Sequence, residues 1–437
     1  MEVKSFVGGA YIPHYKEFTE KKKITNFLVP ERVVIPLSQH IGAHCESLVQ
    51  KGDKIKVGDK IGDSDEYISA PVHSSVTGVV EKIEKRPIYD GSEVSCVVVK
   101  TSKEQEQSFK DVAKRNIDEM NIDELKKAIK EAGIVGMGGA SFPTYVQVNQ
   151  SKKIDTLIIN GAECEPFLTC DHRQMAEYAK ELVKGAKIMA KIIEADNCYF
   201  GIEVNKPDAI EALNQETKNI EGFEVVPLDC KFPQGYKTNI IKAVTGRDVP
   251  RGARSAEIGC LVRNVGTTVA IYEACAYNKP LYERVVTVTG PKVKKPGNYI
   301  IRVGTPVKFI LEQVGVEDLD ESTVVMGGPM TGAAQSHLDA PVVKNTTGVI
   351  VLPSEISRMQ KDHYDCVRCG KCVEYCPMHL YPNKLSIYAE ADMFDECEKW
   401  NVTDCAECGL CAFVCPSYRP IIKYIQKVKP IIKKKNR

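Results

Sequence analysis

Two runs of four cysteines near the end of the chain constrain its fold most. Each run has the spacing C-x2-C-x2-C-x3-C-P, and 28 residues separate the two. Two-cluster ferredoxins bind their [4Fe–4S] clusters through cysteines with this spacing. The pattern therefore predicts two such clusters in the last eighty residues, with cysteines at these positions: Cys366, Cys369, Cys372 and Cys376, then Cys405, Cys408, Cys411 and Cys415.

The fourth cysteine of each run is expected to ligate the cluster that the other run mainly holds. Cluster 1 is predicted to take Cys366, Cys369, Cys372 and Cys415, and cluster 2 to take Cys405, Cys408, Cys411 and Cys376. A zinc site and disulfides are the alternatives. Zinc sites use separated pairs of ligands, and disulfide frameworks are typical of short secreted chains, so both fit less well.

The size and charge of the chain exclude several classes of protein. A chain of 437 residues is expected to form three or four domains. A net charge of +1 gives the chain no overall positive field that would attract nucleic acid. No run approaches the roughly 20 apolar residues of a membrane span, and the start is not expected to be a signal peptide. Many thiols, 17 in all, suit a reducing compartment.

The first hundred residues are predicted to form an arm followed by a β-rich domain. Residues 1–30 look extended, and residues 31–105 carry short apolar runs separated by glycine turns. Their pattern resembles lipoyl and biotinyl carrier barrels. The expected carrier hairpin, 63–66, contains no Lys, so a structural sandwich is predicted rather than a carrier.

Residues 106–278 are predicted to form a Rossmann-like domain. A glycine-rich loop at 133–144 precedes a buried strand at 153–160, which ends in the polar run NGAECEP. A helix at 173–194, a strand at 198–204, a helix at 207–218 and a strand at 223–229 follow. Ligands of such sheets bind beyond the carboxyl ends of the strands. The usual dinucleotide fingerprint is missing, so the loop alone is weak evidence.

The remaining segments complete a multidomain α/β chain. Residues 279–352 have the strand, turn, strand and helix order of a β-grasp. Residues 353–420 hold the two cysteine runs, and residues 421–437 form a tail with seven basic and no acidic residues. The tail is expected to be a solvated helix end or to dock on an acidic partner or membrane.

Several segments together resemble the C subunit of the Rnf complex, the ion-translocating ferredoxin:NAD oxidoreductase. They are FVGG, IPLSQHIGA, APVHSSVTG, GMGGASFPT, IINGAECEP, NVGT, GGPM and both cysteine runs. The loop and NGAECEP also resemble the flavin site of the NADH-oxidising subunit of respiratory complex I. The resemblance implies a barrel-sandwich hybrid, a Rossmann-like flavin domain, a soluble-ligand-binding (SLBB) β-grasp and a two-cluster ferredoxin-like α-helical domain.

The same resemblance implies which residues bind FMN and NAD(H). Phe142 would stack near the nicotinamide, and Asn264 with Thr267 would touch the FMN end. The remaining implied positions line FMN or border both cofactors: Gly136, Gly138, Gly139, Ala140, Asn160, Glu163 and Glu165. No side chain is expected to act as a catalytic nucleophile.

The chain also departs from the family pattern at five positions. Ser141 stands where Gly is usual, Gln147 where Lys is usual, and Ala162 replaces an Asp of complex I. Tyr236 and Lys237 stand where acidic residues help to seat flavin or NADH. These departures bear on how tightly FMN and NADH bind.

The resemblance implies a peripheral subunit on the cytoplasmic face of the membrane, with no membrane span of its own. It would pass electrons between the two clusters, FMN and NAD(H). Its partners would be membrane and cluster-bearing Rnf subunits and, indirectly, ferredoxin, with no nucleic acid. Two alternatives are a soluble electron donor for a reductase, such as proline reductase, and an adaptor without flavin.

Overall fold

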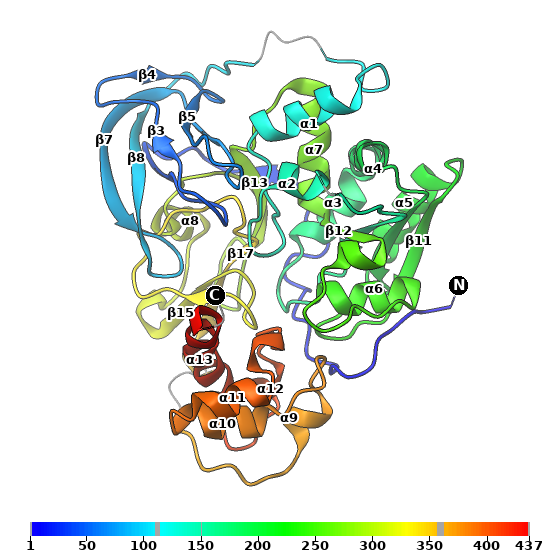
Figure 1. The fold of residues 1–437 in the computed structure, drawn as a ribbon. Coiled ribbons are helices and arrows are strands. Elements are labelled where there is room, and N and C mark those ends of the chain that lie inside the picture. Colours follow the sequence, from blue (N-terminus) through cyan, green and yellow to red (C-terminus); the bar gives the residue numbers. More distant parts are fainter. Residues whose placement is uncertain (1, 110–113, 150, 356–361, 436–437) are drawn as a thin grey trace.

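The computed structural model describes residues 2–109, 114–149, 151–355 and 362–435. They form four packed units, and an N-terminal arm runs between them (Figure 1). The C-terminal helical unit lies at the bottom of that view, beneath the β-grasp and Rossmann-like units. Parts of the predicted domains and tail, 110–113, 150, 356–361 and 436–437, lie outside the described residues.

The first unit is a sandwich of two small sheets, as predicted. One sheet has the order β2-β8-β7-β4 and the other the order β3-β5-β6. Alternating valines and isoleucines, among them Val33, Ile35, Val97 and Val99, fill the space between them. The strands are β2 (Arg32–Pro36), β3 (Glu46–Ser47), β4 (Lys54–Ile55), β5 (Lys60–Asp63), β6 (Val72–His73), β7 (Gly78–Pro87) and β8 (Glu93–Thr101).

The second unit contains a four-stranded parallel sheet in the order β11-β10-β9-β12. Apolar residues are buried on both faces of this sheet, so the strands are largely apolar, and most of their polar residues lie near the strand ends. The strands are β9 (Thr156–Gly161), β10 (Asn197–Glu203), β11 (Phe223–Leu228) and β12 (Cys260–Asn264). The helices are α1 (Ile122–Glu131), α2 (Thr144–Val148), α3 (Cys170–Glu177), α4 (Ala179–Ile193), α5 (Pro207–Thr217), α6 (Lys237–Thr245) and α7 (Val265–Tyr277).

One predicted helix of this unit differs from the structure. The single helix expected at 173–194 is two helices, α3 and α4, because the backbone of Tyr178 leaves the helical region with φ −119° and ψ 30°. Helix α3 also begins earlier, at Cys170. The Glu163 carboxylate accepts the N–H groups of Asp171 and His172 and so caps this earlier start.

The third unit is a β-grasp whose sheet includes one strand from the arm. Its order is β1-β14-β13-β17-β15-β16, and β1 (Ile24–Asn26) runs parallel to β14. The sequence predicted an extended arm there but not this pairing. The other elements are β13 (Glu283–Thr289), β14 (Gly297–Arg302), α8 (Val307–Val314), β15 (Ser322–Met326), β16 (Ala333–Ala334) and β17 (Gly348–Pro353).

The fourth unit is helical and carries both cysteine runs. Its helices are α9 (Lys371–Glu374), α10 (Pro382–Glu390), α11 (Phe394–Lys399), α12 (Leu410–Phe413) and α13 (Ile421–Lys435). Helix α13 covers most of the segment expected as a basic tail. It buries Ile421, Ile425, Val428 and Ile432 in the same core as the cysteines, a spacing that places them on one helix face.

Three lysines of α13 form ion pairs within this unit. Lys427 pairs with Asp392 at 2.6 Å, Lys429 with Glu407 at 2.7 Å and Lys435 with Asp395 at 2.9 Å. Much of the positive charge of this segment is therefore matched by carboxylates of its own domain.

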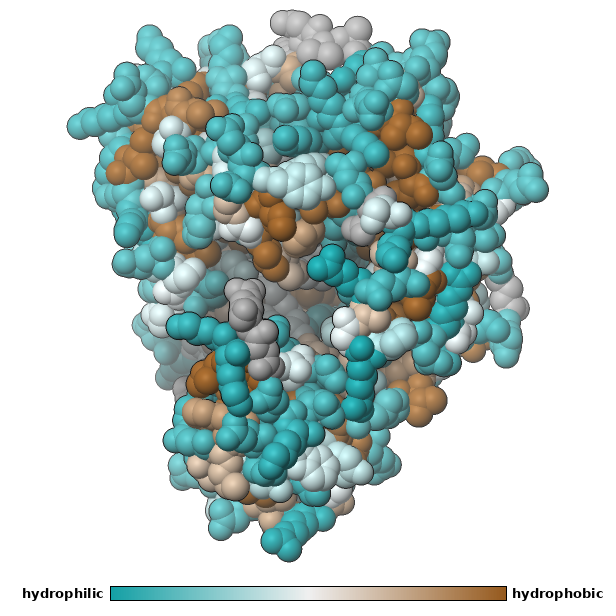
Figure 2. Space-filling view, viewed as in Figure 1, coloured by the Kyte–Doolittle hydropathy of each residue, from teal (hydrophilic) through white to brown (hydrophobic). Residues whose placement is uncertain are grey.

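The outer surface is mainly polar. Hydrophilic side chains cover most of the face in Figure 2, and the apolar ones lie in small separate groups. Among the described residues, none of the helices combines the length and the apolar content that crossing a bilayer requires.

Candidate functional site

The glycine-rich loop is a closed turn at the edge of the parallel sheet. A bridge between Val135 and Pro143 closes it, and the Gly136 N–H donates to the Phe142 carbonyl at 3.0 Å. The Thr267 hydroxyl accepts the N–H of Met137 at 2.8 Å and anchors the loop to α7. Ser141 has φ +53°, in the left-handed region that favours glycine. This strain is a physical reason for glycine to be usual at that position.

A cavity of about 390 Å³ opens beside this loop, within the roughly 300–1,000 Å³ typical of small-molecule sites. Three of the four units supply most of its wall. The Rossmann-like unit contributes Gly138, Gly139, Asn160 and Asn264, the β-grasp contributes the loop 326–332, and the cysteine-bearing unit contributes Ala406 and Cys408.

Six of the ten residues implied by the family resemblance line this cavity: Gly138, Gly139, Asn160, Glu163, Glu165 and Asn264. Gly136, Ala140, Phe142 and Thr267 are not among the lining residues. Gly136 and Thr267 instead hold the loop closed from behind.

Asp171 also lines the cavity, and sequence reasoning missed it. Its Oδ2 accepts a hydrogen bond from Asn264 Nδ2 at 2.7 Å, whereas its Oδ1 is buried and has no partner among the described residues. Burial, followed by the neighbouring charge of Glu163, raises the pKa of Asp171 to about 7. An orphaned buried oxygen fits a ligand that brings hydrogen-bond donors, as the polar end of a flavin ring does.

Asn264 joins the loop, the sheet and α7 at one point. Its Oδ1 accepts the Thr267 N–H at 3.2 Å and so caps α7. A Cβ atom on Gly138 would lie 2.7 Å from Asn264 Nδ2. The close approach of the Asn264 side chain therefore requires glycine at this position. The bare backbone of Gly138 and Gly139 therefore leaves room for a ligand beside Asn264.

The two glutamates of NGAECEP are already bonded within the protein. Glu163 caps α3, accepting the Asp171 N–H at 2.9 Å and the His172 N–H at 3.2 Å. Glu165 accepts the Met330 N–H at 3.0 Å and the Thr331 hydroxyl. Burial raises the pKa of Glu165. These carboxylates shape the cavity wall by fixing α3 and the 326–332 loop.

The cysteines surround two further cavities. Cys366, Cys369, Cys372 and Cys415 line one, and Cys376, Cys405, Cys408 and Cys411 line the other. These groups are the same two sets of four that the spacing predicts. Four thiols around each cavity fit the all-cysteine ligation of a [4Fe–4S] cluster, and the assignment of each ligand stays a prediction.

The second cysteine set is adjacent to the large cavity. Cys408 lines both this cavity and the one that its own set surrounds, and Tyr236 also lines the large cavity. Burial first, and then nearby Cys405 and Cys408, raise the pKa of the Tyr236 hydroxyl. The first set faces outward: Cys369 is exposed, and its neighbour Val367 is 67% exposed.

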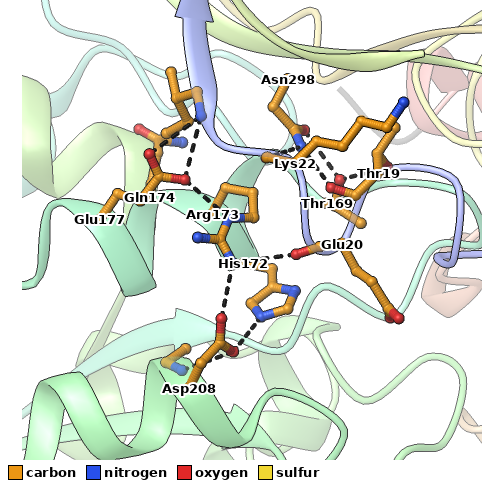
Figure 3. A network of polar contacts seen from close by, with 12 residues as sticks. Thr19, Glu20, Lys22, Thr169, His172, Arg173, Gln174, Glu177, Asp208 and Asn298 are labelled. Atoms are coloured by element: carbon orange, nitrogen blue, oxygen red, sulfur yellow. Dashed lines mark hydrogen bonds and ion pairs between the residues drawn. The ribbon is translucent and has the colours of Figure 1, made fainter.

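A polar network fastens the arm to the helix behind the cavity (Figure 3). Arg173 on α3 donates to Glu177 at 2.9 Å, to Asp208 at 2.8 Å and to the Glu20 carbonyl at 3.1 Å. Glu177 in turn accepts the N–H of Ile24 at 3.1 Å. The arm is thereby held against α3 just before it enters the β-grasp sheet.

Arg173→Ala is expected to destabilise the protein by about 2–3 kcal/mol. Its side chain is 10% exposed, and its removal leaves two carboxylates without the guanidinium that pairs with them. The expected loss of stability is smaller than for breaking a fully buried ion pair, because the Asp208 side chain is half exposed. Urea unfolding measures this change. Arg247→Ala removes a partly exposed pair with Asp155 and should cost less than about 1 kcal/mol; equal losses in the two variants would contradict the account.

Family models match successive parts of the chain. They are the Nuo51 FMN-binding domain over residues 129–273, the RnfC barrel sandwich hybrid domain over 4–104, the SLBB domain over 285–334 and a 4Fe-4S dicluster domain over 358–416. The predicted fold class is confirmed. The barrel model begins at residue 4 and thus includes most of the arm that the sequence set apart.

Similar proteins cover nearly the whole chain. The C subunit of the Na⁺-translocating ferredoxin:NAD⁺ oxidoreductase complex of Acetobacterium woodii is 40% identical over 92% of this chain and 90% of its own. The C subunit of the proton-translocating complex of Clostridium ljungdahlii is 41% identical over 98% and 94%. The C subunit of the ion-translocating oxidoreductase complex of Vibrio cholerae is 36% identical over 91% of this chain and 52% of its own.

Among solved structures, an NAD⁺-reducing [NiFe]-hydrogenase in its H₂-reduced state has a TM-score of 0.52. It is 17% identical and covers 74% of this chain and 66% of its own, so the likeness concerns the fold alone. The matched domains and the cavities fit FMN and two [4Fe–4S] clusters, as the sequence predicts. With relatives about 40% identical over nine-tenths of its length, the chain belongs to the RnfC family, the C subunits of ion-translocating ferredoxin:NAD⁺ oxidoreductase complexes.

Proposed function

We propose that this protein is the NAD(H)-facing peripheral subunit of an ion-translocating ferredoxin:NAD⁺ oxidoreductase complex. One observation carries the proposal: the cavity beside the glycine loop shares Cys408 with the second cysteine set. A dinucleotide exchanges electrons as hydride, whereas an iron–sulfur cluster exchanges them singly. FMN, when bound, supplies both kinds of transfer.

The chain's own residues divide the work of binding. Gly138 and Gly139 offer bare backbone to FMN, Asn264 positions Asp171, and the unpartnered Asp171 oxygen accepts a donor of the ligand. Glu163 and Glu165 hold the surrounding walls in place. Glu163 does so through α3, and Glu165 through the β-grasp loop 326–332, which lines the same cavity.

The positions of the two cysteine sets imply an order for the clusters. Cluster 2, held by Cys405, Cys408, Cys411 and Cys376, would lie next to the flavin cavity. Cluster 1, held by Cys366, Cys369, Cys372 and Cys415, would lie farther out. Cluster 1 is therefore the point at which a cluster-bearing partner protein exchanges electrons, with ferredoxin acting through that partner.

We place the protein at the cytoplasmic face of the membrane, held there by the other subunits. The relatives from Acetobacterium woodii and Clostridium ljungdahlii belong to Na⁺-translocating and proton-translocating ferredoxin:NAD⁺ oxidoreductase complexes. Neither ion is assigned to this chain.

The test uses the anaerobically purified protein with its clusters reconstituted. We expect it to retain FMN, to contain about eight irons per chain and to reduce a dye with electrons from NADH. Protein that holds both clusters yet neither retains FMN nor bleaches with NADH would refute the proposal.

A further inference from the structure

Arg263 is a buried cation that forms no ion pair within the part of the chain that the structure describes. It lies on β12 and is 5% exposed. One guanidinium nitrogen donates to the Val262 carbonyl at 2.9 Å, whereas Nε and Nη2 are buried and have no partner among the described residues. Burial lowers the pKa of Arg263 to about 9, and no carboxylate opposes this shift. A buried, unpaired charge is costly, so such a group indicates that an anion completes the site.

Two exposed cations, Lys237 and Arg254, extend the positive charge around Arg263, and Lys237 is near enough to both arginines to be affected by their charges. Lys237 is the first residue of α6, and Arg254 precedes the short turn Ser255–Ile258. Partial burial, and then the charges of Arg254 and Arg263, lower the pKa of Lys237. The Glu257 carboxylate accepts the backbone N–H of Arg254 at 2.9 Å and forms no ion pair with its guanidinium. Within the described residues, no ion pair involves any of these three cations.

The start of α6 adds to this positive field. This nine-residue helix has no side-chain cap and no acidic residue in its first turn. Its first N–H groups thus contribute partial positive charge beside Lys237. Asn160 fixes the turn before the helix by donating to the Gly235 carbonyl at 2.8 Å.

Two of the three cations, Lys237 and Arg263, are adjacent in sequence to residues that line the flavin cavity. Tyr236 and Asn264 both line that cavity, and they are the chain neighbours of Lys237 and Arg263. A molecule that fills the cavity and carries a phosphate could therefore reach these two cations, and Arg254 adds its charge to that of Lys237. Arginine and lysine together are a usual pair for phosphate, since arginine provides a fork of donors and lysine a point charge.

We propose that Lys237, Arg254 and Arg263 form a phosphate-binding subsite, which takes a phosphate of the dinucleotide substrate or that of FMN. The proposal rests on the proposed function for the choice of ligand. It also gives a role to Lys237, which stands where the family pattern has an acidic residue. The positive charge of Lys237 favours binding of an anion at this position.

The test compares Arg263→Gln and Lys237→Gln with Lys242→Gln as control. Lys242 lies on the same helix, is exposed and pairs with Asp248. Calorimetry with FMN is measured on flavin-free protein. Calorimetry with ADP-ribose, and the KM and kcat for NADH, are measured on FMN-loaded protein. We expect Arg263→Gln and Lys237→Gln each to weaken ADP-ribose binding and to raise the KM for NADH about tenfold. Their kcat and FMN content should stay unchanged, and Lys242→Gln should match the wild-type protein in every measurement.

Other results of these measurements would reassign the subsite or overturn the proposal. Loss of FMN affinity with unchanged ADP-ribose binding would assign the subsite to the flavin phosphate. Wild-type affinities for both ligands in both variants would overturn the proposal. Lys237→Gln keeps the test valid if Arg263→Gln does not fold, because Lys237 is exposed. If wild-type protein binds ADP-ribose but does not oxidise NADH, the proposed function fails while the subsite is still tested.

Discussion

Changing Cys376 or Cys415 to Ser is expected to remove one cluster, and in each case the cluster held mainly by the other cysteine run. Cys376 lines the cavity of Cys405, Cys408 and Cys411, although it belongs to the first run. Cys415 likewise lines the cavity of the first three cysteines. Each variant should therefore keep about four of the eight irons.

The identity of the lost cluster is tested by pairing variants. The EPR spectrum of reduced Cys376→Ser should match that of Cys405→Ser, and the spectrum of Cys415→Ser should match that of Cys366→Ser. Cys397→Ser is the control, because this buried cysteine of the same core lines neither cavity. A Cys376→Ser spectrum that matches Cys366→Ser would show that each run binds its own cluster.

Gly138→Val is expected to weaken FMN binding about tenfold or more. A Cβ atom there would lie 2.7 Å from the Nδ2 atom of Asn264. Asn264 cannot move aside cheaply, because it caps α7 and holds Asp171 at 2.7 Å. The added side chain must therefore enter the cavity or break these bonds. Retained flavin, measured by absorbance after gel filtration, reports the effect.

Gly136→Ala is the matched control for this loop. Gly136 does not line the cavity, and a Cβ atom there would approach nothing closer than 3.8 Å. We expect this variant to retain FMN. Equal flavin loss in the two variants would show that the loop backbone as a whole, rather than the contact at Asn264, determines binding.

Local patterns predicted those parts of the site that depend on local chemistry. The cysteine spacing predicted the two sets of four, because the return of the fourth cysteine to the other cluster is built into the spacing. The polar residues after β9 were predicted to face a ligand, because parallel strands bring such residues to one edge of the sheet. Six of the implied residues do line the cavity.

The parts that sequence reasoning missed depend on partners far away in the chain. Glu165 accepts the N–H of Met330, 165 residues later, and the hydroxyl of Thr331, and these two bonds turn its carboxylate toward the β-grasp loop. Strand β1 has three residues and no alternating pattern, so its pairing with β14 left no trace in the sequence. The sequence did not single out Arg263, because nothing in its local pattern shows that two of its nitrogens are buried without a partner among the described residues.

Electrons are expected to pass between the flavin cavity and the outer cluster through cluster 2. The most direct test mixes NADH with the anaerobic, FMN-loaded variants Cys415→Ser and Cys376→Ser and follows cluster reduction by freeze-quench EPR. We predict that the cluster left in Cys415→Ser is reduced at the wild-type rate, whereas the cluster left in Cys376→Ser is reduced far more slowly after its flavin bleaches. The reverse order of rates would contradict the account.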